Sequence, residues 1–514
     1  MGLFSDIYNT VAKFFRPQEE QGDASKSVAT NRLKLVLMQD RTNLTPKILE
    51  QMRGELIDLL SRYVELDKEL LELNFEQEGE QVALMLSIPV IRAKDEEEIE
   101  AALKEEAEKL AEKAEELETS SEEEEEDVSE IFVRVNSGGV SLKQNDFILT
   151  LLSLYWDEGR KEIEEFSKES TFPTKGKTTS YNQITTVAAQ DLIRVVMAYA
   201  FDRARLKYGY KLLRGADFDK RGAVDGELRI QRFDTLKDKL PDVLDVHSWH
   251  EFLKAIMNAG YLSGDLILSG NAIFYSYAFY LIAKHRFHAS YNENMHLTSL
   301  WFFYASLVSL YTGSFESTVE SHLNSIKDLS TLKEYKDFIL SRVNERLTND
   351  YFDITLVGSE GLAVSGKGNN AWNAYVAALN IMDAKILFSK SNLLVSKLFE
   401  PGTDGNRKSL EKHHLFPKAH MKAQGYTDAK INQMANYAFI DWKDNMDILD
   451  DAPSVYYPIV CEGRSDEEIL RMEEENALPH GWENMPYEDF LVERRKLMAA
   501  KIKQAFDLLK KNVE

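Results

Sequence analysis

The sequence predicts an α+β protein that is mostly helical, and three observations support this fold class. Two short segments near the start, Leu33–Met38 and Val82–Ile88, carry alternating or continuous apolar residues, as strands do. From Ile131 onward, long segments carry apolar residues at spacings of three and four, which is typical of helices. Residues 93–130, between these parts, are strongly acidic. We therefore expect a small α/β unit, an acidic helical spacer and a large helical module.

Composition narrows the class of protein. The chain has 514 residues, enough for about three domains, and 44% of them are hydrophobic. A single cysteine, Cys461, excludes a disulfide scaffold and a zinc site built from cysteines alone, and it fits a cytoplasmic setting. The net charge of −24 excludes a basic footprint for nucleic acid over the whole chain. Residues 93–130 alone contribute −15, so most of this acidity belongs to one segment.

The first segment, GLFSDIYNTVAKFFR, predicts an amphipathic helix. Leu3, Phe4 and Ile7 fall on one face at helical spacing, and Lys13 and Arg16 lie at its end. Such a helix either lies in a membrane interface or packs on its own protein. The periodicity alone leaves both interpretations open.

A strand–helix–strand unit is expected next. Thr45 and Pro46 are typical of an N-cap and a first helical position, and apolar residues continue at helical spacing to Tyr63. The strand at Val82–Ile88 closes the unit near Arg92. The apolar residues that follow are spaced three and four positions apart, which predicts one amphipathic helix or one strand of a coiled coil. The run of acidic residues after them predicts a solvated tether.

The remainder predicts helices joined by short loops. The two most apolar runs, Ile273–Ala283 and Leu300–Leu310, are too short to span a bilayer, so we expect core helices there. The periodic segments are Asp146–Tyr155, Ala188–Leu213, Trp249–Ala259, Ala272–Lys284, Leu297–Tyr311, Leu332–Leu347, Asn373–Lys397 and Tyr487–Lys511.

The strongest chemical signal is the run KHHLFP at 412–417, followed by Asn436 and Asn445. Adjacent strand side chains point to opposite faces, so His413 and His414 can divide two tasks. One imidazole can hold a divalent ion, and the other can take a proton from water. Asn445 would add an oxygen ligand. The alternative is a pair of surface histidines that share no site.

This run and its asparagines resemble the HNH, or ββα-metal, nuclease motif. The resemblance implies that His413 and Asn445 bind Mg²⁺ or another divalent metal, that His414 is the general base and that Asn436 braces the loop. Basic residues near the histidines are candidates for contacts with DNA phosphates, although a solvated loop would show the same charges. These candidates are Lys412, Lys418 and Arg407.

Further segments resemble GmrSD-type restriction endonucleases. They are IFVRVNSGGVSL at 131–142, Trp301–Ser317, Glu411–His420 and Tyr487–Lys501. The resemblance implies a DNA endonuclease that acts in restriction or phage defence. The two boxes that mark the nucleotide-handling half of this family are missing before Asn136, so we recognise no nucleotide site.

The start of the chain resembles MinE, the topological specificity factor for the septum site in cell division. Ser27–Arg41, Leu44–Val64 and Val82–Pro89 carry the resemblance in that order. It implies a homodimer that binds the membrane-bound ATPase MinD and stimulates its hydrolysis. The residues implied for MinD contact are Arg32, Leu33, Lys34, Leu35 and Val36, and those implied for the membrane are Leu3, Phe4 and Ile7.

We therefore expect a MinE-like unit at 1–92, an acidic helical linker at 93–130, a helical GmrSD-like module at 131–400 and an HNH-like nuclease domain at 401–514. The first functional hypothesis is a metal-dependent DNA endonuclease fused to a MinE-like unit. The alternative is a MinE-type regulator of MinD that carries an inactive, truncated nuclease module. We expect a cytoplasmic protein held at the inner face of the cell membrane by its first helix.

Overall fold

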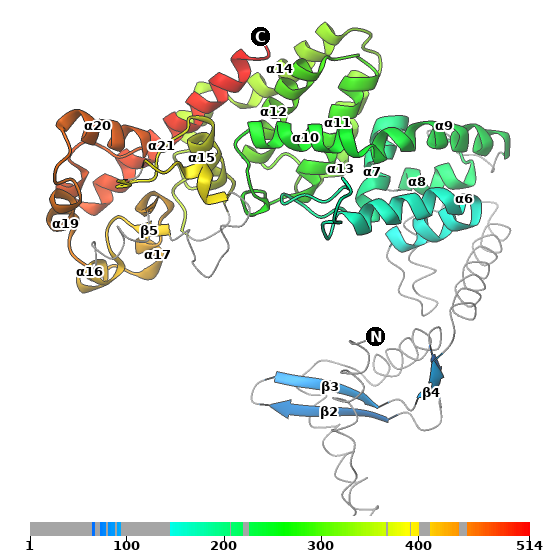
Figure 1. Cartoon of the computed structure of the whole chain (residues 1–514), viewed down its shortest axis with the longest axis horizontal. Helices are drawn as coiled ribbons and strands as arrows, with labels where there is room; N and C mark the ends of the chain where they lie inside the picture. The colour runs from blue at the N-terminus through cyan, green and yellow to red at the C-terminus, as the bar shows by residue number, and fades with distance from the viewer. Residues whose placement is uncertain are drawn as a thin grey trace, which may run out of the picture. The chain divides into compact units, whose positions relative to one another are not determined.

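A computed structural model describes four strands between residues 64 and 93, and residues 144–514 apart from 206, 219–225, 366–368, 391, 400–411 and 441–449. The chain divides into two compact units, Met1–Lys143 and Gln144–Glu514 (Figure 1). The acidic linker and the residues expected to contact MinD and the membrane lie outside the described residues. The finer boundaries expected from the sequence stay predictions.

The first unit contains two antiparallel strand pairs. β2 (Glu72–Glu78) pairs with β3 (Gln81–Ser87) in continuous register from Glu72 opposite Ser87 to Glu78 opposite Gln81. β1 (Val64–Leu66) pairs with β4 (Val90–Ala93), with a register shift after its second residue. The expected closing strand corresponds to β3. The sequence pattern missed β2 because only two of its seven residues, Leu73 and Phe75, are apolar, which makes the alternation too short to indicate a strand.

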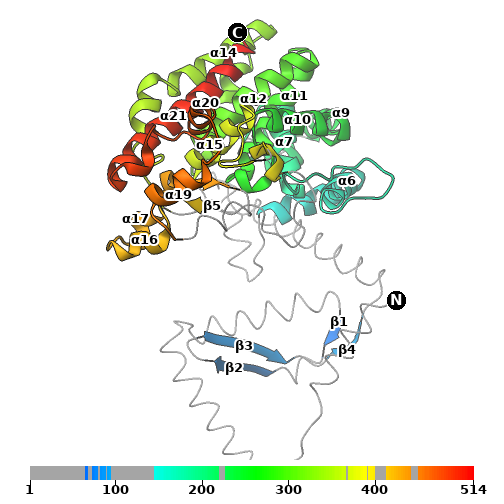
Figure 2. The same cartoon turned by 60° about the vertical axis from the view of Figure 1, so that its left-hand side comes forward.

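The second unit is mostly helical, as Figures 1 and 2 show, which confirms the expected fold class at this level. Its longer helices are α6 (Gln144–Glu169), α7 (Ala189–Phe201), α8 (Lys207–Arg214), α9 (Gly226–Leu244), α10 (Val246–Asn258), α11 (Gly270–His285), α12 (Tyr291–Leu307), α13 (Phe315–Ile326), α14 (Leu332–Arg346), α15 (Asn370–Ile381), α19 (Pro453–Val460), α20 (Asp466–Glu475) and α21 (Tyr487–Lys511). Two short helices, α16 (Lys418–Ala423) and α17 (Asp428–Ile431), lie between the strands β5 (Lys412–His414) and β6 (Tyr437–Phe439).

The core of this unit is built around α11 and α12. Every residue from Ala272 to Ala283 and from Leu297 to Leu307 is buried, so neither run has a polar face. α7 packs on α11, α10 packs on α12, and α21 returns across α12 and α15. The expectation of core helices for the two apolar runs is therefore confirmed. No helix in the described part of the chain has the length and apolar character needed to cross a bilayer.

Local caps explain where several helices begin. Thr331 and Glu334 form a reciprocal capping box at the start of α14, and Ser465 and Glu468 do the same for α20. Two expected helices were too long. The segment Ala188–Leu213 is broken after α7, where Asp202 takes a left-handed conformation with φ of 51°. The α-helix in the segment Asn373–Lys397 ends at Ile381, and mostly irregular chain leads to a short 3₁₀ helix at Val395–Phe399.

Candidate functional site

The two adjacent histidines lie on β5, which pairs with β6 as an antiparallel ladder. His413 is opposite Ala438, and His414 is opposite Tyr437. His413 is buried, with 9% of the residue exposed, whereas His414 is partly exposed. Adjacent strand residues present their side chains to opposite faces, which agrees with this difference in exposure. The next helix of a ββα unit, with Asn445, would fall at 441–449, outside the described residues.

Asn436 ties the end of β5 to the start of β6. Its side chain is completely buried. Its Oδ1 accepts a hydrogen bond from the backbone N–H of Phe416 at 2.8 Å. Its Nδ2 donates to the carbonyl oxygens of Phe416 at 3.1 Å and of Ile431 at 3.0 Å. One amide thus satisfies three buried backbone groups, each of which would be costly to leave unpaired.

His414 has a polar neighbour that the sequence analysis did not identify. Its Nε2 lies 3.0 Å from Oδ1 of Asn432, and the Tyr437 hydroxyl donates to the same oxygen at 3.1 Å. The rings of His414 and Tyr437 are 4.6 Å apart. Burial lowers the pKa of His414 below its ordinary value, because it disfavours the charged imidazolium. The imidazole is therefore neutral near pH 7, as a general base must be.

Two lysines near the histidines share one acidic partner. Lys418 and Lys422 both form ion pairs with Asp428, at 3.3 and 3.2 Å. Their hydrogen bonds to Asp428 hold the pKa of that carboxyl below its ordinary value. Both lysines remain largely exposed, and exposed pairs of this kind contribute little to stability. They stay available to an anion, while Arg407 lies outside the described residues.

The expected metal site is described only in part. His413 lies on β5, but Asn445 is outside the described residues. Among the residues that the structure describes, no three histidine, cysteine or acidic side chains gather closely enough to hold a metal ion. An imidazole nitrogen and an amide oxygen are a suitable donor set for a divalent ion that keeps several waters. The donor types therefore fit such an ion, and their arrangement stays a prediction.

Two helices buttress the β5–β6 ladder. Arg494 of α21 is completely buried and donates from Nη1 to the carbonyl oxygen of Ala435 at 2.7 Å. The hydroxyl of Tyr456 on α19 donates to the carbonyl oxygen of Leu415 at 2.6 Å. The sequence analysis missed both residues because their partners lie 59 and 41 positions away along the chain. The only feature of the nearby sequence that pointed to Arg494 is that it is one of two adjacent arginines in the last helix.

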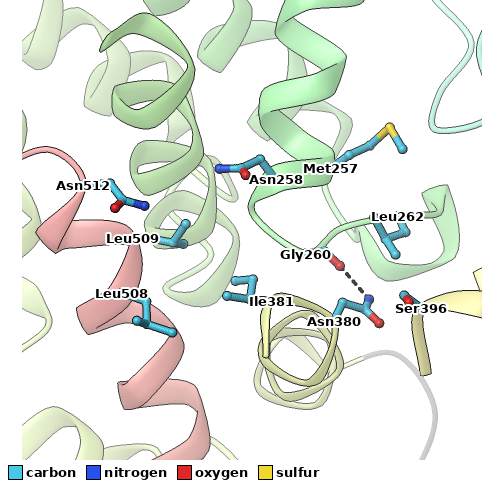
Figure 3. A pocket seen from close by; sticks show the side chains of 10 residues that line it. All are labelled: Met257, Asn258, Gly260, Leu262, Asn380, Ile381, Ser396, Leu508, Leu509 and Asn512. Atoms are coloured by element: carbon cyan, nitrogen blue, oxygen red, sulfur yellow. Dashed lines mark hydrogen bonds between the residues drawn. The ribbon is translucent and has the colours of Figure 1, made fainter. Parts of the chain in front are cut away.

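A separate cavity of about 470 Å³ lies where the ends of α10, α15 and α21 meet (Figure 3). The residues that line it are all uncharged: Met257, Asn258, Gly260, Leu262, Asn380, Ile381, Ser396, Leu508, Leu509 and Asn512. Figure 3 shows the amide of Asn380 donating to the carbonyl oxygen of Gly260, at 2.7 Å. This contact joins the end of α15 to the loop after α10. The cavity contains none of the residues expected from the sequence to have chemical roles.

Comparison with known proteins identifies the start of the chain. A family model described as "Septum formation topological specificity factor MinE" matches residues 8–90. Three similar proteins are each named "Cell division topological specificity factor". That of Desulfitobacterium hafniense is 46% identical over 71 residues, covering 14% of this chain and 78% of the relative. That of Carboxydothermus hydrogenoformans is 43% identical over 70 residues, covering 14% and 80%.

The third, from Pelotomaculum thermopropionicum, is 48% identical over 66 residues, covering 13% of this chain and 73% of the relative. No solved structure matches the chain. The residues matched by the family model fall within the expected MinE-like unit at 1–92. The resemblance of the later residues to HNH and GmrSD nucleases stays a prediction.

Proposed function

Because the chain belongs to the MinE family through residues 8–90, we propose that its N-terminal region regulates cell division by binding MinD and stimulating ATP hydrolysis. The observation that supports this proposal is the match to MinE over nearly all of the first ninety residues. Contact with MinD is assigned to residues 32–36, and contact with the membrane to Leu3, Phe4 and Ile7. The active form is a homodimer.

The test is MinD-dependent phosphate release on anionic lipid vesicles with the full-length chain. Arg32→Ala should reduce the stimulation at least tenfold, because it removes a cation from the assigned contact. Lys26→Ala removes a cation before this segment and is the matched control. Equal stimulation by wild type and Arg32→Ala, or no stimulation by the folded wild-type protein, would contradict the proposal.

The bracing of the β5–β6 ladder by Asn436 favours a second function. We propose that residues 401–514 hydrolyse phosphodiester bonds in DNA. His414, which is neutral near pH 7, takes a proton from the attacking water. His413 and Asn445 would hold a divalent ion, which when bound stabilises negative charge on the phosphate. Lys412, Lys418 and Arg407 contact the phosphate backbone and orient the strand.

Plasmid nicking tests this second function. The full-length protein is assayed with Mg²⁺ or Mn²⁺ and with EDTA. His414→Ala should abolish cutting, with a loss of about 10²–10⁴-fold, because it removes the general base. His420→Ala is the matched control, since His420 is a nearby histidine on α16 that hydrogen-bonds with Gln424. Cutting that persists in His414→Ala, or that EDTA leaves unchanged, would rule out the assigned site.

A further inference from the structure

We propose that Asn432 is a positioning residue that fixes the tautomer of His414, so that Nδ1 is the nitrogen that accepts the proton. The functional part of this inference rests on the proposed nuclease activity. The structural part concerns only the hydrogen bond between the two side chains, which lie 18 positions apart along the chain.

The direction of this hydrogen bond follows from its donors and acceptors. An amide oxygen has no hydrogen to give, so the 3.0 Å contact between Asn432 Oδ1 and His414 Nε2 requires a hydrogen on Nε2. The Tyr437 hydroxyl donates to the same oxygen at 3.1 Å. Two donors therefore converge on one acceptor, and the neutral imidazole has its free lone pair on Nδ1.

The backbone around Asn432 is held on both sides. Its own N–H donates to the carbonyl oxygen of Asp428 at 2.9 Å, which closes α17. The carbonyl oxygen of the preceding residue, Ile431, accepts the hydrogen bond from Nδ2 of Asn436. The residue that braces the ladder therefore also anchors the segment that carries Asn432. This arrangement limits how far the amide can move relative to β5.

The fixed tautomer defines the proton-transfer step. One O–H bond of water breaks, and its proton forms a bond to Nδ1 of His414. The electron pair stays on the water oxygen, which bonds to phosphorus as the P–O bond of the leaving oxygen breaks with its pair. The imidazolium that forms keeps its Nε2–H on Asn432 Oδ1. A hydrogen bond to a charged donor is stronger than one to a neutral donor, so this contact strengthens as the positive charge develops.

Nuclear magnetic resonance reads the tautomer directly. The full-length protein is labelled with ¹⁵N-histidine and studied near pH 8, where the neutral ring dominates; His414→Gln assigns the signal. We expect the Nε2–H form in wild type. Asn432→Ala should give a mixture of tautomers and lower plasmid cutting about 10–100-fold, as the loss of such a supporting contact typically does. Asn432→Asp keeps an acceptor oxygen and should restore the single tautomer.

Gln433→Ala is the matched control, because Gln433 is the neighbouring residue and its amide donates only to the carbonyl of Ala429 among the contacts described. An Nδ1–H signal in wild type would overturn the inference, and that result needs no variant to fold. An unchanged single tautomer in folded Asn432→Ala would also overturn it. A tautomer that changes in Asn432→Ala in a protein that never cuts DNA would support the positioning role and reject the nuclease proposal.

Discussion

Asn436 and Phe416 exchange two hydrogen bonds, one in each direction. The Phe416 N–H donates to Oδ1 of Asn436, and Nδ2 of Asn436 donates to the Phe416 carbonyl oxygen. In an antiparallel ladder, a residue exchanges both backbone hydrogen bonds with a residue of the partner strand. Here the side-chain amide of Asn436 takes the place of that partner residue for Phe416. The N–H of Leu415 adds a bond to the backbone carbonyl of Asn436 at 2.8 Å. The ladder of β5 and β6 therefore continues past its last strand residues.

Replacing this amide should destabilise the second unit. Asn436→Ala leaves three buried backbone groups without their partner, so we expect a loss of about 3 kcal/mol in the free energy of unfolding. All six tryptophans lie in this unit, so their fluorescence in urea follows its unfolding specifically. Asn484→Ala, which removes an exposed amide, should change stability by less than about 0.5 kcal/mol. Equal effects of the two substitutions would show that the bracing contributes nothing.

The sequence was informative where a signal is local. The apolar runs of α11 and α12 predicted core helices, and the expected segment Leu332–Leu347 corresponds to α14. Breaks that depend on a single backbone conformation, such as the left-handed Asp202, leave no trace in periodicity. β2 was missed because five of its seven residues are polar.

The residues of the candidate site also differ in whether the local sequence indicates them. The motif pattern proposes His413, His414 and Asn436 because their residue types and order carry the resemblance, and their roles stay predictions. Asn432 and Arg494 contribute through contacts that form only when distant segments pack together. Nothing in the periodicity of α17 or α21 indicates which residue will face the ladder. Contacts that form only on folding are therefore harder to predict from sequence than residues that belong to a motif.

His480 should make stability depend on pH. Its Nδ1 lies 3.0 Å from the carboxylate of Glu473, which is buried and also accepts from the Tyr457 hydroxyl at 2.7 Å. The hydrogen bond to Glu473 raises the pKa of His480 above its ordinary value. A raised pKa in the folded state gives stability that is fully present below about pH 6.5, the unfolded value, and lost as pH rises through the folded value.

The measurement is the melting temperature of wild type and His480→Gln between about pH 5.5 and 8.5. Wild type should lose more stability over this range than the variant, since glutamine does not titrate. His420→Gln, on the surface of α16, should follow wild type. Parallel curves for wild type and His480→Gln would disprove the linkage.

Gly260 and Gly463 allow the cost of an unfavourable backbone conformation to be distinguished from the cost of a steric collision. Both have a φ of 82°, which disfavours any residue with a Cβ atom. A Cβ at Gly463 would meet open space, whereas one at Gly260 would collide with the carbonyl oxygen of Ala377 on α15. Gly463→Ala should therefore cost about 1–2 kcal/mol, and Gly260→Ala about 3 kcal/mol or more. Urea unfolding checks this order, and equal costs would mean that α15 moves aside freely.

Arg494 should stabilise the second unit more through its packing and its hydrogen bond than through its charge. Its guanidinium is completely buried, and this burial lowers its pKa because the charged form loses its water. Arg494→Met removes the bond to the Ala435 carbonyl but also removes a charge that is costly to bury, so we expect a loss of about 1–3 kcal/mol. Arg494→Ala leaves a cavity as well and should lose about 2 kcal/mol more.

Lys496→Met is the control on the same helix, because Lys496 forms only an exposed ion pair with Glu493 among the contacts described. This substitution should change stability by less than about 0.5 kcal/mol. Urea unfolding followed by tryptophan fluorescence ranks the three variants. If Arg494→Met lost as much stability as Arg494→Ala, the bond to Ala435 and the charge would outweigh the packing. The α21 helix would then hold the ladder mainly through this guanidinium rather than through its apolar face.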